Sequence, residues 1–130
     1  MGDLMSTVKA NDLQTTTGDI PTVKGQKLIP TAWVNFNGIN TVSIRDSENV
    51  SSVGDDGSGR YTVNFSTAMA NINYSCHGGA GGTVRNNTLS NVAFPQNQYA
   101  TGSVGLDTQY AHGTAFDPPI VCVTIMGGQA

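Results

Sequence analysis

The feature that most constrains the fold is a strict two-residue alternation of apolar and polar side chains over residues 60–66. Tyr61, Val63 and Phe65 share the apolar phase of this run. Because successive side chains of a β-strand point to opposite faces, the pattern predicts a strand with one buried face. Residues 54–59, which come just before it, are rich in glycine and aspartate, so we expect a tight turn and a hairpin here.

The same alternation recurs in shorter runs along the chain. No window has apolar residues at helical spacing over three turns, and the many glycine and β-branched residues disfavour helices. Short strands with frequent turns predict an all-β fold, a small antiparallel β-sandwich or jelly-roll-like domain. Strands are expected within residues 33–37, 41–45, 50–53, 60–66, 72–76, 88–94, 103–106 and 120–125, and turns or breaks at residues 46–49, 54–59 and 78–82. The side chains expected to be buried are Val34, Phe36, Val42, Ile44, Tyr61, Val63 and Phe65.

Residues 1–30 differ from the rest of the chain, because they form a polar, threonine-rich stretch with only isolated apolar side chains. Such a segment cannot bury enough apolar surface to offset the entropy that it loses on ordering. We expect an extended arm that docks onto partner proteins, followed by one domain over residues 31–130. The apolar residues expected to anchor the arm are Val8, Leu13, Ile20, Val23 and Leu28.

Charged residues make up only 12% of the chain, about half the usual share, and the net charge is −3. Such a surface has no basic face for nucleic acid or for an anionic membrane, so we expect neither partner. No apolar run approaches the roughly 20 residues of a membrane span, and the N-terminus lacks the layout of a signal peptide, so assembly in a cytoplasm is expected. A small domain with few charges gains stability by burying a face against identical copies, which predicts a homotrimer.

The motifs of catalysis and cofactor binding are not found in the sequence. The glycines of residues 78–82 are not followed by the Lys-Ser or Lys-Thr of a phosphate-binding loop, and residues 55–59 lack the alternating carboxylates of a calcium loop. No serine stands in a Gly-x-Ser-x-Gly context, and no pair of carboxylates can be singled out for glycoside cleavage. We therefore expect a protein that is not an enzyme and has no cofactor.

The histidines and cysteines give no metal or redox motif. Neither His77 nor His112 has a second ligand-type residue at metal-binding spacing, so no metal site is expected within one monomer. Three copies of either histidine could still converge on a trimer axis and bind an ion there. Cys76 and Cys122 are too far apart for a Cys-x-x-Cys motif, and because each falls on an expected strand, both are expected to be buried free thiols.

Residues 95–119 form the least regular stretch and combine aromatic side chains with amides. Aromatic faces beside amide groups can bind sugars, and irregular loops also carry such residues for their own packing. Both interpretations stay open. The candidate contacts to a host receptor, such as a cell-surface glycan, are Gln96, Asn97, Tyr99, Tyr110 and His112.

Three segments resemble one known domain: AWVNFNG at residues 32–38, TVSIRDSENVSSV at 41–53 and GRYTVNFSTAMANINYS at 59–75. This domain recurs in tail-fibre and other virion proteins of bacteriophages, many of which infect cyanobacteria and marine bacteria. Residues 102–104 and 117–123 look like its end, and residues 5–14 are similar to the start of related phage proteins. The resemblance implies a structural role in the virion, without catalysis, and it identifies no receptor. The longer fibre proteins have a long shaft where this chain has only its short arm.

Four functions are compatible with these observations. A short trimeric tail or baseplate fibre would use the arm as its anchor to other virion proteins and the distal loops to touch the host surface. A capsid decoration protein or head fibre would lay the arm on the shell. A free carbohydrate-binding module and a glycan-cleaving spike come from other classes. We expect the first of these, located in the virion.

Overall fold

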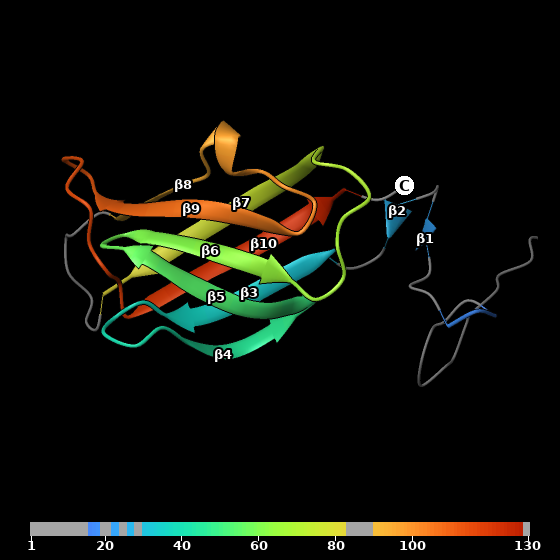
Figure 1. The fold of residues 1–130 in the computed structure, drawn as a ribbon, viewed down its shortest axis with the longest axis horizontal. Coiled ribbons are helices and arrows are strands. Elements are labelled where there is room, and N and C mark those ends of the chain that lie inside the picture. The colour runs from blue at the N-terminus through green and yellow to red at the C-terminus, as the bar shows by residue number, and fades with distance from the viewer. Residues whose placement is uncertain (1–15, 19–21, 24–25, 28–29, 83–89, 129–130) are drawn as a thin grey trace, which may run out of the picture.

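The computed structural model describes residues 16–18, 22–23, 26–27, 30–82 and 90–128. Two four-stranded antiparallel sheets stack as the layers of a sandwich (Figure 1), which confirms the predicted fold class. The first sheet has the order β4-β3-β10-β7, with bounds Ser43–Glu48, Ala32–Asn37, Ile120–Gly127 and Tyr74–Gly81. The second sheet has the order β5-β6-β9-β8, with bounds Val50–Gly57, Arg60–Phe65, Ser103–Tyr110 and Ser90–Ala93. The remaining elements are the strand pair β1 (Thr22–Val23) and β2 (Gln26–Lys27) and the 3-10 turn η1 (Gln96–Gln98).

The core lies between the two sheets and is built by alternate residues of the central strands. In the first sheet Val34 of β3 pairs with Val123 of β10, and in the second sheet Tyr61 of β6 pairs with Leu106 of β9. All four side chains are buried. Phe36 meets the ring of Tyr61 edge to face across the sandwich, with the ring centroids 5.1 Å apart. Full burial of a large apolar side chain is worth about 1.5–3 kcal/mol, so this core is the main source of stability.

The predicted phase of the strands is confirmed for most of the residues expected in the core. Val42 is half-buried and packs against the core cluster. Ile44 is 37% exposed, so its predicted burial is wrong. Ile44 is opposite Phe36 and shares its inward phase, but β4 is the edge strand of its sheet, so one side of the Ile44 side chain stays open. The residues that were expected to be buried and are buried are Val34, Phe36, Tyr61, Val63 and Phe65.

Two predicted turns are shorter in the structure. β4 continues through Glu48, so the chain reverses at Asn49 alone, with φ of 53°, and not over residues 46–49. Asparagine tolerates this left-handed backbone, and the Asn49 side-chain Nδ2 fixes the corner by donating to two backbone carbonyls at 3.2 Å. β5 likewise continues through Gly57, so the hairpin to β6 turns at residues 58–59.

The glycine-rich residues 78–82 were expected to break the sheet, and this prediction is wrong. β7 runs through Gly81 and pairs with β10 along its length. Gly78 is opposite Val123, and a Cβ atom at Gly78 would lie 2.6 Å from Cγ1 of Val92 in β8. The missing side chain lets an edge strand of one sheet approach an edge strand of the other. Glycine here serves close packing and not a turn.

The two cysteines differ in their surroundings and are not bonded to each other. Cys76 is half-buried, and burial raises the pKa of its thiol. Cys122 is exposed on the outer face of β10, opposite Gly79 of β7. The expectation that both thiols are buried is therefore wrong for Cys122, because this residue occupies the outward phase of its strand.

A hydrogen-bond network joins segments that are far apart in the sequence. The Tyr61 hydroxyl donates to Oδ1 of Asp117 at 2.9 Å and to the Gly38 carbonyl at 3.2 Å, and the Gly59 N–H donates to the same Oδ1 at 2.7 Å. The Gly38 N–H donates to the carbonyl of Pro118 at 2.9 Å. A Cβ atom at Gly38 would lie 2.5 Å from the Tyr61 hydroxyl oxygen, so only glycine fits. Burial, followed by the Asp117 carboxylate, raises the pKa of Tyr61. We call these five residues the Tyr61 lock.

Candidate functional site

The five predicted receptor contacts do not form one site. Gln96, Asn97 and Tyr99 come before β9, whereas Tyr110 ends this strand and His112 follows it. β9 has eight residues. Tyr99 bridges Val104, six residues before Tyr110, so at about 3.3 Å per residue these two positions lie roughly 20 Å apart along β9. Asn97 lies over the middle of the strand, where it lines a hollow with Leu106 and Asp107, and it is not grouped with Tyr110 or His112.

The group around Tyr110 packs on itself. The Tyr110 ring stacks on Phe116, with centroids 4.0 Å apart and planes at 11°, and on His112, with centroids 5.5 Å apart and planes at 27°. Nδ1 of His112 lies 3.0 Å from the Thr114 hydroxyl, and the Tyr110 N–H donates to the Thr114 carbonyl at 2.9 Å. Rings that stack on each other leave less of their faces for a sugar. These contacts favour the loop-packing interpretation for Tyr110 and His112.

The group around Tyr99 borders a hollow of about 400 Å³ with a mixed lining, which we call the apolar hollow after its three aromatic or aliphatic members. Tyr99 stacks on Tyr74, with centroids 5.0 Å apart and planes at 28°. Burial, followed by contact with the Cys76 thiol, raises the pKa of Tyr99 to about 12. The residues that line this apolar hollow are Ile72, Asn73, Phe94, Gln96 and Tyr99.

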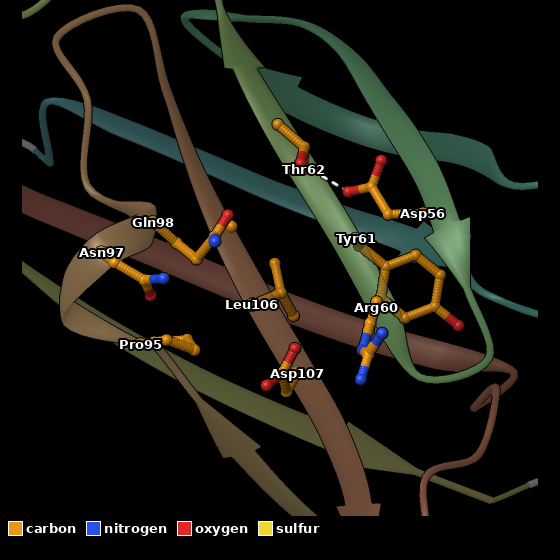
Figure 2. Close-up of a pocket in the computed structure, with 10 residues that line it drawn as sticks. Asp56, Arg60, Tyr61, Thr62, Pro95, Asn97, Gln98, Leu106 and Asp107 are labelled. Atoms are coloured by element: carbon orange, nitrogen blue, oxygen red, sulfur yellow. Dashed lines mark hydrogen bonds between the residues drawn. The ribbon is translucent and has the colours of Figure 1, made fainter.

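A larger hollow, of about 550 Å³, lies on the outer face of the second sheet. Figure 2 shows Pro95, Asn97 and Gln98 on one side of it, extending from the η1 segment, and residues of β5, β6 and β9 on the other side. η1 therefore stands between the two hollows, because Gln96 borders the apolar one while Asn97 and Gln98 border this one. We call it the polar hollow, and its lining consists of Asp56, Arg60, Tyr61, Thr62, Pro95, Asn97, Gln98, Gly105, Leu106 and Asp107.

Charged side chains flank the floor of the polar hollow. Arg60 of β6 is the register partner of Asp107 of β9, which places their Cβ atoms about 5 Å apart on the outer face. The Thr62 hydroxyl donates to Oδ2 of Asp56 at 2.6 Å and so orients this carboxylate (Figure 2). Within the described part of the chain, the side chains of Arg60 and Asp107 form no hydrogen bond or ion pair with another residue. Both groups are therefore free to bind a ligand.

Gly105 of β9 determines how η1 sits on the sheet. A Cβ atom at Gly105 would lie 2.7 Å from Oε1 and 2.9 Å from Cβ of Gln98. Gly105 is not among the residues with positive φ, so its backbone conformation does not require glycine. The requirement comes from the Gln98 side chain, which rests where a larger residue would stand. Gly105 thus holds one wall of the polar hollow in place.

Of the residues that line the polar hollow, only Asn97 was among the receptor contacts predicted from the sequence. Asp56 was assigned to a turn, and Arg60 to the polar phase of the most regular strand. That phase placed Arg60 on the outer face correctly, but an exposed polar phase is the ordinary condition of any half-buried strand. The signal that could have indicated this site is the scarcity of charge, because a cluster of charged residues is unusual in a chain with only 12% of them.

The other sequence-predicted residues give no second site. His77 is exposed on β7, and in the described ranges no three metal-ligating side chains gather. A joint ion site at a trimer axis stays a prediction. Of the anchor residues, Val23 belongs to β1, whereas the others lie outside the described residues: Val8, Leu13, Ile20 and Leu28. The described part of the chain also has no helix long and apolar enough to span a membrane.

Comparison of the chain with protein-family models, with curated proteins and with solved structures gave no significant match in any of the three. Function therefore has to be inferred from the residues and geometry of this chain.

Proposed function

We propose that the chain is a structural component of a bacteriophage virion, namely a short trimeric tail or baseplate fibre that contributes to host-surface attachment and is not an enzyme. The Tyr61 lock is the observation that carries this proposal. The segments that resemble the phage domain supply its parts: residues 32–38 contribute Gly38, residues 59–75 contribute Gly59 and Tyr61, and residues 117–123 contribute Asp117 and Pro118. Segments that resemble parts of one domain and also bond to one another in space support a resemblance of the whole fold, and not of isolated strings.

The surface of the sandwich also suits an attachment role. A rigid β-scaffold with irregular segments and hollows at its surface is a common way to present binding residues. The two hollows beside η1 are open to solvent-borne ligands, and the outward residues of the strands are mostly uncharged. In this proposal residues 1–30 dock onto other virion proteins, and the sandwich faces the host.

Two alternatives share part of this support. A capsid decoration protein or head fibre would use the same arm and the same trimer, but it needs contacts with the shell more than an open concave surface. A free carbohydrate-binding module would use the hollows and leave the arm without a role. The combination of arm and hollows favours the fibre.

Immunogold labelling of phage particles that contain the chain tests the proposal. Antibodies against the sandwich should place gold at the tail tip or baseplate. Labelling over the capsid would replace the fibre by a decoration protein or head fibre. Failure of the chain to sediment with particles at all would contradict a structural role in the virion.

Deleting residues 1–27 separates the two parts of the chain. The truncated protein should remain soluble and folded, because the core lies within the sandwich, and it should fail to join particles. Analytical ultracentrifugation should find a trimer for the full chain. A monomer at micromolar concentration, together with normal incorporation of the truncated chain, would contradict both the trimer and the anchoring arm.

A further inference from the structure

The polar hollow has the size of a small-ligand site, and its floor is the face of a sheet and not a sheet edge. Its volume of about 550 Å³ falls within the usual 300–1,000 Å³ range of ligand sites. The floor consists of β6 and β9, the two central strands of the second sheet; β6 pairs with β5 and β9, and β8 pairs with β9 from Asp107 onward. A peptide could not add to this surface as an extra strand, because such addition requires an open sheet edge. Recognition must come from side chains.

These side chains suit a ligand that carries many hydroxyl groups. The carboxylates of Asp56 and Asp107 only accept hydrogen bonds, Arg60 only donates, and the amides of Asn97 and Gln98 do both. A sugar hydroxyl can donate one hydrogen bond and accept others, so it can satisfy both kinds of partner at once. Figure 2 shows these groups arranged on two sides of the same hollow, the amides extending from the η1 segment and the charged groups rising from the strands. Planar groups with fixed donors and acceptors bind such ligands with defined orientation.

The charge of the polar hollow limits the class of ligand. Two carboxylates and one guanidinium leave a net negative charge, so phosphate, sulfate and carboxylate groups are repelled. Arg60 lies between the two acids and cannot by itself reverse this balance. A neutral ligand meets no such penalty.

The geometry points to the polar hollow as a binding site for a neutral saccharide. This inference rests on the proposed attachment function for its biological setting, while the binding itself is a property of the isolated chain. Arg60 and Asp107 make the charge-assisted hydrogen bonds to sugar hydroxyls, Asp56 is held in place by Thr62, and Gly105 sets the position of the η1 wall. The apolar hollow on the other side of η1 is a separate surface.

Amide chemical shifts of the full chain, followed by NMR during sugar titration, test this inference. The probes are oligosaccharides containing glucose, galactose, mannose, rhamnose or N-acetylglucosamine, with lactose and sialyllactose as a matched neutral and anionic pair. At least one neutral probe should shift residues of β6, β9 and η1 with a Kd of about 1 mM or tighter. If lactose binds, sialyllactose should bind more weakly.

Variants decide which surface binds. Arg60→Gln and Asp107→Asn should each weaken binding about tenfold, because each removes a charge-assisted hydrogen bond. Gly105→Ala should weaken it similarly by displacing Gln98. The controls are Glu48→Gln, an exposed acid of β4, and Gly79→Ala, where an added Cβ meets nothing within 4 Å; both should bind as the wild type does. Circular dichroism of every variant checks that it is folded.

Three outcomes of the titrations would overturn the inference. Absence of binding by the whole panel at about 10 mM, preference for sialyllactose, or shifts confined to Ile72, Phe94 and Tyr99 would each do so. The result is also independent of the virion experiment. Saccharide binding by a chain that never labels particles would reject only the proposed virion role, and labelled particles with a chain that binds no saccharide would reject only the polar hollow.

Discussion

The Tyr61 lock and the polar hollow are both clusters of polar groups next to a glycine, yet they differ in how these groups are satisfied. In the lock, Tyr61 and its partners are joined by short hydrogen bonds, and among the described residues no buried side-chain nitrogen or oxygen lacks a partner. In the polar hollow, Arg60 and Asp107 face each other without an ion pair in the described part of the chain. Polar groups that bond internally stabilise the fold, whereas groups that remain open can bind something else.

The largest expected effect is on the lock. Tyr61→Ala should lower the free energy of unfolding by about 3–5 kcal/mol, because it removes a fully buried ring from between the sheets. Urea denaturation followed by circular dichroism measures the change. Tyr99→Ala is the matched control, since the Tyr99 ring is only half-buried and should cost less. Equal losses would mean that the lock has no special structural role.

Two glycine substitutions compare the Tyr61 lock with the open outer face of a sheet. Gly38→Ala should cost about 1–3 kcal/mol, because the added Cβ would lie 2.5 Å from the Tyr61 hydroxyl and 2.8 Å from the Pro118 carbonyl. Gly79→Ala, in open space on the outer face of β7, should stay within about 0.5 kcal/mol of the wild type. Thermal melting of both variants provides the measurement. A stable Gly38→Ala protein would show that the lock tolerates rearrangement.

Removing only the Tyr61 hydroxyl should have an intermediate effect. Tyr61→Phe keeps the ring in the core and breaks the hydrogen bonds to Asp117 and Gly38, which should cost about 1 kcal/mol. Asp117 still accepts from the Gly59 N–H, so its carboxylate is not left without a partner. A crystal structure of the variant would check that the ring has not moved, and an unchanged denaturation midpoint would argue against the hydrogen bonds as a source of stability.

The raised pKa of Tyr61 predicts a loss of stability in alkali. The unfolded phenol ionises near pH 10, while burial and Asp117 keep the folded phenol protonated to higher pH. The folded state then binds more protons than the unfolded state, so stability is fully present below about pH 10 and falls as the pH rises above it. Tyr61→Phe should show a shallower fall, because the remaining decline comes from other groups such as Tyr74 and Tyr99. Parallel slopes for the two proteins in urea denaturation would refute this assignment.

The smallest effect on stability is expected in the polar hollow. Arg60→Gln and Asp107→Asn should each change the free energy of unfolding by less than about 0.5 kcal/mol, since neither side chain bonds to another described residue. Denaturation curves that overlay the wild type, together with weakened saccharide binding, would separate the two clusters as proposed. A clear destabilisation would place the hollow with the lock as part of the fold.

The sequence was sufficient to predict the sandwich and most of its core, because burial of Val63 or Phe36 follows from local alternation. It was not sufficient wherever a distant residue imposes the requirement. Gly78 has no side chain because Val92 packs there, and Gly105 because Gln98 packs there, so neither marks a break. The charged residues of the polar hollow come from β5, β6 and β9, and only the sheet register brings Arg60 beside Asp107.

The exposed thiol of Cys122 offers a ready point of chemical attachment. Alkylating reagents need the thiolate, and burial keeps the Cys76 thiol both shielded and harder to ionise, so maleimide should couple first at Cys122. Cys122 faces Gly79, which leaves room for a dye or a gold cluster. This position is on the outer face of the first sheet, and the polar hollow opens from the outer face of the second. A fluorophore placed there would follow the native chain in solution or on a particle without obstructing the polar hollow.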